Sequence, residues 1–115
     1  MQDQLVNLYF ILAIGYNLLS IARADLKGSG LAPTDPMAGI TLMCLLYLLY
    51  SLDTVLPETS RQLLILSLLA LVVRFGIVRH LFSTDLSEYS SSVARYGAAL
   101  INILGVVAIS TSLLL

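Results

Sequence analysis

The sequence predicts an all-α integral membrane protein in which four antiparallel transmembrane helices are joined by short links. Its 115 residues are 58% hydrophobic and only 11% charged, whereas a soluble domain is closer to half apolar and a quarter charged. Four apolar stretches of about twenty residues fill most of the chain, and each is long enough to cross a hydrocarbon core of roughly 30 Å. Backbone groups within hydrocarbon must pair internally, which favours helices over open strands.

The first two apolar stretches are separated by a link rich in glycine and proline, residues that favour turns. We expect the first span over about residues 5–22, because the apolar run ends at Arg23. Pro36 can open the second span, since a proline in the first helical turn sacrifices no hydrogen bond. We therefore place this span over about residues 36–55, and Pro57 closes it.

The last two spans follow from the same pattern. Only residues 57–61 separate the second span from the third, which is expected over about 62–82, so these two helices are antiparallel neighbours. A polar link over 83–92 precedes the fourth span, expected over about 93–115. The whole chain, 1–115, is thus predicted to be a single four-helix transmembrane domain.

Positive charges flank the predicted spans unevenly. The links after the first and third spans carry Arg23, Lys27, Arg79 and Arg95, whereas the opposite side carries only Arg61. Lys and Arg are concentrated in cytoplasmic links of membrane proteins. We therefore expect these two links to face the cytoplasm and both termini to face outside.

Three polar residues are expected at a similar depth inside the spans. Arg74 lies within the third span, where a charge costs roughly 2.5 to 3.5 kcal/mol on the insertion scale. Asn17 and Asn102 reach a comparable level in the first and fourth spans. One interpretation is an intramembrane polar layer of these three residues, with a further partner for the charge. The other is that the Arg74 side chain extends towards the lipid headgroups.

The fourth span also carries a face of small residues. Small side chains let helix backbones approach closely, and such faces are typical of helix association in membranes. We expect this helix-docking face to contact another helix. Its members are Ala94, Ala98, Asn102, Gly105, Ala108 and Ser112.

Several functions are disfavoured by composition. A net charge of -1 without a basic cluster argues against nucleic acid binding. The single Cys44 excludes an internal disulfide and a multi-cysteine metal site, and no base is evident that would activate it in an enzyme. His80 is the only histidine. It could ligate a haem with a second ligand from elsewhere, but a histidine at the membrane interface without a ligand is the simpler interpretation.

Three functional hypotheses remain. The first, which we favour, is a small non-catalytic accessory or assembly subunit that packs against a larger membrane protein complex, without cofactor or metal. The second is a homo-oligomeric transporter or channel with Arg74 in its polar centre. The third is an intramembrane cofactor-binding protein that uses His80. The expected partners are the lipid bilayer and other membrane subunits.

Overall fold

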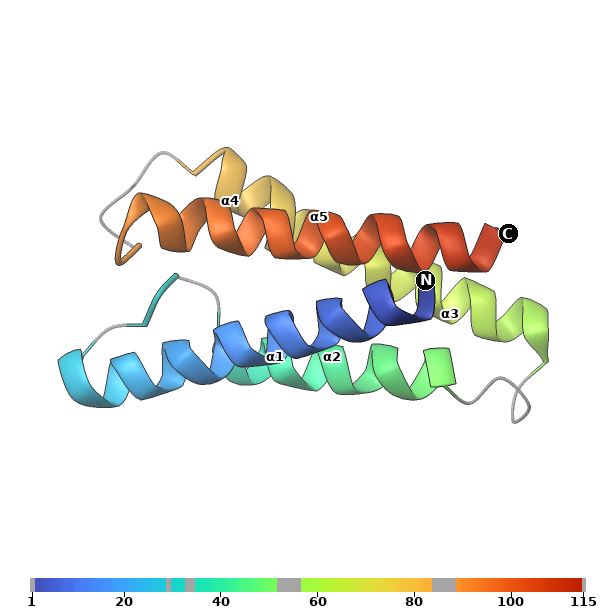
Figure 1. The fold of residues 1–115 in the computed structure, drawn as a ribbon, viewed down its shortest axis with the longest axis horizontal. Coiled ribbons are helices and arrows are strands. Elements are labelled where there is room, and N and C mark those ends of the chain that lie inside the picture. Colours follow the sequence, from blue (N-terminus) through green and yellow to red (C-terminus); the bar gives the residue numbers. More distant parts are fainter. Residues whose placement is uncertain (1, 29, 33–34, 52–56, 84–88, 115) are drawn as a thin grey trace.

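The computed structural model describes residues 2–28, 30–32, 35–51, 57–83 and 89–114. In chain order the helices are α1 (Gln2–Lys27), α2 (Pro36–Ser51), α3 (Glu58–Leu71), the π-helical segment η1 (Val72–Val78), α4 (Arg79–Leu81) and α5 (Ser92–Leu114) (Figure 1). The segments α3, η1 and α4 follow one another without a break and form one continuous helical rod. The expected all-helical fold is confirmed for the described part of the chain.

Three of the helical segments are long and apolar enough to cross a membrane. They are Gln4–Lys27, Glu58–Leu81 and Ser92–Leu113. The fourth, α2, is apolar but has only 16 residues, and residues 52–55 at the end of the expected second span lie outside the described residues. The expected fourth span also reaches Leu115, which lies outside them as well.

Two helix boundaries differ from those expected from apolar runs. Helix α1 continues five residues beyond the expected end at 22, because charged residues are compatible with an exposed last turn, and Lys27 there complements the helix dipole. Helix α3 begins at Glu58 rather than at 62, directly after Pro57. An acidic residue in the first turn stabilises a helix start. Apolarity locates the buried middle of each helix and misses its polar ends.

The link after α1 folds back over the last turns of that helix. Gly28 has a φ of 83°, in the left-handed region that glycine adopts without strain at helix ends. The backbone amide of Leu31 then donates to Ser20 Oγ at 2.8 Å, and Arg23 Nη1 donates to the Gly30 carbonyl at 2.9 Å. The side chains of α1 therefore satisfy the backbone of the link.

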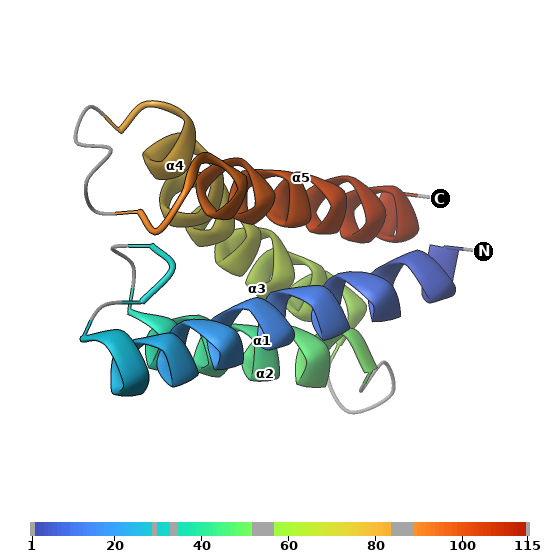
Figure 2. The same ribbon diagram turned by 60° about the vertical axis from the view of Figure 1, so that its left-hand side comes forward.

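The helices run alternately in opposite directions, so that both termini lie at one end of the bundle and both longer links lie at the other (Figures 1 and 2). The two links are joined by a hydrogen bond from the Ser90 amide to the Leu31 carbonyl, at 3.1 Å. Helix α1 packs against α2 and α5, and η1 packs against α5. Within the described residues the backbone of α2 lies close to that of α3, whereas no Cα atom of α2 comes within 8 Å of a Cα atom of η1, so the two backbones diverge towards the linked end.

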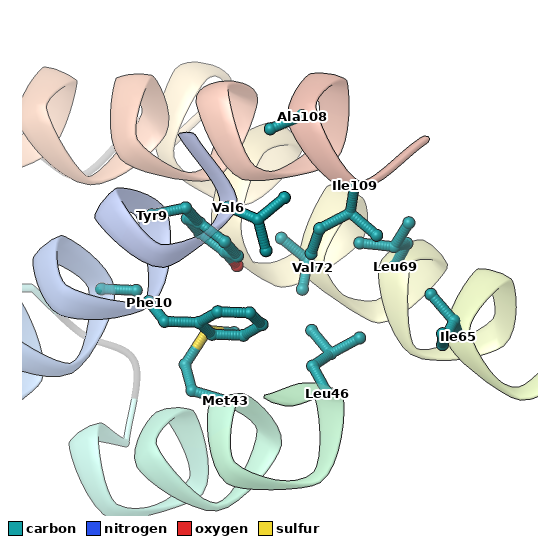
Figure 3. Packing of buried hydrophobic residues seen from close by; sticks show 11 residues of the cluster. Val6, Tyr9, Phe10, Met43, Leu46, Ile65, Leu69, Val72, Ala108 and Ile109 are labelled. Carbon is teal, nitrogen blue, oxygen red and sulfur yellow. The ribbon is translucent and has the colours of Figure 1, made fainter. Parts of the chain in front are cut away.

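A cluster of buried apolar side chains fills the centre of the bundle (Figure 3). Tyr9 of α1 is fully buried there, and its ring lies directly against Gly105 of α5. Ala98 and Ala108 on the same side of α5 are also buried. Small residues on α5 thus allow α1 and α5 to approach closely.

Arg61, at the start of α3, binds the end of α2. Its Nε donates to the carbonyl of Leu49 and its Nη2 to the carbonyl of Tyr50, each at 2.7 Å. Its Nη1 also lies 3.0 Å from Oε1 of Glu58, with which it forms an ion pair. The last carbonyls of a helix have no partner within the helix, so this buried guanidinium supplies donors that α2 lacks.

Arg95, in the first turn of α5, repeats this arrangement at the other end of the rod. Its Nε donates to the carbonyl of His80 at 2.6 Å, and its Nη2 donates to the carbonyls of Leu81 and Ser83 at 2.9 and 3.2 Å. Each end of the rod is therefore joined to its neighbour by an arginine that binds backbone carbonyls.

A matched pair of glycine substitutions tests the contact between α1 and α5. We expect Gly105→Ala to lower the free energy of unfolding by about 1 to 3 kcal/mol, because the added methyl group meets the buried ring of Tyr9. Gly97→Ala on the same helix meets no atom within 4 Å and should raise stability by about 0.5 to 1 kcal/mol through helix propensity. Chemical unfolding in mild detergent measures both changes, and equal effects would contradict the packing described here.

Candidate functional site

A cavity of about 410 Å³ lies where α2 and η1 diverge. Helices α1 and α5 also contribute to its lining, which is mostly apolar. This size and character are typical of binding pockets for small molecules, which occur between the helices of bundles. The polar and charged residues in the lining are Tyr16, Asn17, Asp35, Arg79, His80 and Asn102.

Asn102 uses its amide group to hold the bundle together. Its Nδ2 donates to the carbonyls of Ala98 and Gly76 at 2.9 and 3.1 Å, and its Oδ1 accepts from the Tyr9 hydroxyl at 3.4 Å. A side chain on Gly76 would collide with this amide. Asn102 therefore joins α5 to η1 and α1, and its hydrogen-bonding groups are occupied within the protein.

Asn17 has hydrogen-bonding capacity left over. Its Nδ2 donates to the carbonyl of Ala13, one turn earlier in α1, at 2.9 Å. Within the described part of the chain its Oδ1 accepts no hydrogen bond, and one Nδ2 hydrogen is unused. The amide rests against Gly39 of α2, where a larger side chain would displace it. Asn17 is thus the amide of the cavity that could bind a ligand.

Opposite charges border the cavity near the linked end of the bundle. Asp35 directly precedes α2, and its Oδ1 accepts from the amide of Met37 at 3.0 Å. Arg79 follows η1 on the other side of the cavity. Among the residues described, the two side chains do not form an ion pair with each other. A ligand with separated opposite charges could therefore occupy the space between them.

His80 is almost completely buried beside the cavity. Its Nδ1 lies 2.9 Å from the Tyr89 hydroxyl, and the two rings meet edge to face. No group of three or more potential metal ligands gathers within the described ranges. The histidine that the sequence suggested as a haem ligand is thus engaged with Tyr89 through one ring nitrogen.

The structure does not bring Arg74 to the two asparagines. Asn17 and Asn102 both line the cavity, whereas Arg74 is exposed on η1. Its guanidinium carbon lies 5.6 Å from the ring centre of Phe75. Similar depth along three helices does not place three side chains on facing surfaces, and the π-helical backbone of η1 alters which side each residue faces.

The small-residue face of α5 lies against helices of the same chain. Ala94, Ala98, Gly105 and Ala108 are buried, and the Ser112 hydroxyl lies 2.9 Å from the Tyr50 hydroxyl of α2. Asn102, the remaining member of this face, makes the contacts described above. The whole face is therefore occupied by internal packing.

A second hollow, of about 450 Å³, lies at the opposite end of the bundle and is lined mainly by polar groups. Four of its polar side chains already bind one another in pairs. Arg61 pairs with Glu58, and the Tyr50 hydroxyl lies 2.9 Å from Ser112 Oγ. The cavity between α2 and η1 is therefore the stronger candidate site.

Sequence reasoning missed Asp35 and Arg79 as partners across a cavity. Asp35 precedes Pro36 and therefore has the signature of a helix cap, which gives no sign of a ligand. In the sequence, Arg79 is interpreted only as one of the positive charges that flank the predicted spans. Neither residue carries a local motif, because their relation depends on the divergence of two helices.

The two asparagines should respond differently to removal of the amide. Asn102→Leu should reduce stability by about 1 to 3 kcal/mol, because it leaves the buried Tyr9 hydroxyl without an acceptor. Asn17→Leu removes only one hydrogen bond within α1 and should change stability by less than about 1 kcal/mol. Unfolding in detergent compares the two, and a larger loss for the Asn17 variant would refute the distinction.

Comparison with known proteins assigns no family to this fold or cavity. No family model, curated protein or solved structure matches the chain.

Proposed function

We propose that the chain is an integral membrane protein whose four helices all cross the bilayer, and that it acts as a non-catalytic subunit of a larger membrane complex. The observation that carries this proposal is the position of Arg74. It is exposed on η1, within an apolar segment long enough to cross a membrane. Among the described residues it makes neither a hydrogen bond nor an ion pair.

A charge in this position is costly unless something outside the chain binds it. Arg74 lies seven residues before Leu81, which corresponds to about 10 Å of helix rise. Ionisable residues at such depth usually pair with other groups and mark functional surfaces. Its setting in a π-helical segment supports the same conclusion, because such segments are rare and frequently occur at functional sites.

The chemistry of Arg74 indicates the kind of partner. A guanidinium forms two parallel hydrogen bonds with a carboxylate, and such pairs are strong where water is excluded. We therefore propose that a transmembrane helix of the partner presents an Asp or Glu to Arg74.

A different protein fits this role better than a second copy of the chain. Each Asp and Glu in the described part of the chain lies near a terminus or near a helix end, so none of these acids in a second copy would lie at the depth of Arg74. A symmetric pair with Arg74 at its two-fold axis would also bring two like charges together, which is unfavourable. A homo-oligomeric channel with Arg74 at its centre is thus the weaker candidate.

Conservative replacement of Arg74 tests this proposal. Arg74→Lys keeps the charge but loses the planar fork, so the amount of complex should fall about tenfold, and Arg74→Ala should abolish it. Val78→Ala, another exposed position on η1, should leave assembly unchanged. Native mass spectrometry of the complex extracted from membranes in mild detergent measures the amount and composition of each assembly.

Two results would contradict the proposed docking through Arg74. Full assembly of the lysine variant would indicate a side chain that merely extends to the headgroups. A particle containing only copies of this chain would favour the channel hypothesis.

The proposed orientation places the linked end of the bundle in the cytoplasm. Its basis is the excess of Lys and Arg at that end. In a Cys44→Ser background, which removes an exposed thiol, Thr59→Cys should react with an impermeant thiol reagent in intact cells. Lys27→Cys should react only after the membrane is opened, and the reverse pattern would overturn the orientation.

A further inference from the structure

We propose that the cavity between α2 and η1 holds one acyl chain of a zwitterionic glycerophospholipid whose headgroup carries a phosphate and a primary ammonium. Arg79 would bind the phosphate, Asp35 the ammonium and Asn17 an ester carbonyl. This proposal shares with the proposed function only the insertion of the chain into a bilayer. Arg74 does not line the cavity, so lipid binding does not require the partner complex.

The cavity suits an apolar chain better than a hydrated ligand. The cavity has a volume of about 410 Å³ and lies between four helices. Most of its lining consists of aliphatic and aromatic side chains. Within the described residues no Cα atom of α2 lies within 8 Å of a Cα atom of η1, so the two backbones are too far apart to close the space by themselves. In a membrane, a hydrocarbon chain is the most abundant molecule that could fill such a space.

The polar groups follow the same order as those of a glycerophospholipid. Asp35 and Arg79 border the cavity near the linked end. Gly39, which touches Asn17, lies one helical turn after Asp35, so this amide is about 6 Å deeper along α2. Further from the linked end the lining includes Met43 of α2 and Val72 of η1, and the amide of Asn102 is already hydrogen-bonded within the protein. Charges, an amide and hydrocarbon therefore succeed one another, as do headgroup, ester and acyl chain in the lipid.

The opposite charges favour a zwitterionic headgroup over an anionic one. Arg79 makes no hydrogen bond or ion pair with the rest of the described chain, which leaves its guanidinium available for a phosphate. Asp35 uses one carboxylate oxygen as a helix cap, and the side chain remains exposed. An ammonium group could bind this carboxylate, whereas a headgroup with only negative charge would be repelled by it.

Native mass spectrometry of the full chain in detergent can test the site with two lipid probes. Phosphatidylethanolamine and phosphatidylglycerol of identical acyl composition differ in the headgroup ammonium. We expect one phosphatidylethanolamine to be retained per chain, with about tenfold weaker retention of phosphatidylglycerol.

Four variants assign the contributions of individual residues. Ala38→Phe should abolish retention of both lipids by filling the cavity. Arg79→Gln should weaken retention of phosphatidylethanolamine about tenfold. Asp35→Asn keeps a good helix cap and should remove the preference between the two lipids. Lys27→Gln changes a charge at the same end of the bundle but outside the cavity lining, and should have no effect.

Two results would contradict the proposed lipid site, and neither would contradict the proposed partner complex. Equal retention of both lipids by the unmodified chain would overturn the headgroup assignment. Retention that survives Ala38→Phe, in a variant that unfolds like the unmodified chain, would overturn the cavity as the site. Neither result depends on Arg74 or on the presence of a partner complex.

Discussion

The need to satisfy carbonyl groups at helix ends shapes this small bundle. Arg61 and Arg95 each lie early in one helix and donate to the last carbonyls of the helix before it. Donors of this kind are valuable where water is scarce, because an unpaired buried carbonyl costs free energy comparable to a lost hydrogen bond. The continuous rod from α3 to α4 is thereby hydrogen-bonded to α2 at one end and to α5 at the other. Its oblique path across the bundle leaves the cavity beside η1.

The amides of Asn17 and Asn102 show how one residue type can serve two purposes. Asn102 has all its groups engaged and ties α5 to η1 and α1. Asn17 lines the same cavity and retains an unpaired oxygen within the described residues. Two glycines make these positions possible, because Gly39 and Gly76 leave room for the amides against neighbouring backbones. The cavity therefore contains one amide that is held in place by hydrogen bonds, that of Asn102, and one that still has groups to bind a ligand, that of Asn17.

The length of the apolar stretches and the spacing of small residues predicted the helices. The side of a helix on which a single side chain lies could not be predicted in the same way. Apolar length identified the helices, since burial in a bundle or a bilayer demands it over many residues. The small-residue face of α5 was recognised as a packing surface, but spacing alone could not say that α1 of the same chain would cover it. Arg74 was grouped with the asparagines by depth, whereas η1 directs it outwards. A π-helical segment changes the side of the helix on which each residue lies, and no sequence motif predicts such a segment. Likewise, Arg61 and Arg95 were counted as flanking charges because their carbonyl acceptors are contributed by the fold.

The attachment of α2 at only one end of the rod gives that helix the geometry of a lever arm. With 16 residues, α2 is about 24 Å long. A rotation of about 10° around the Arg61 end, which packing against α1 resists, would displace the Asp35 end by about 4 Å. Because α2 also packs along α1, the distance between Asp35 and Arg79 depends on that packing as well as on the attachment near Arg61. Selection on the size of the cavity mouth could act through residues near Arg61 that never touch a ligand.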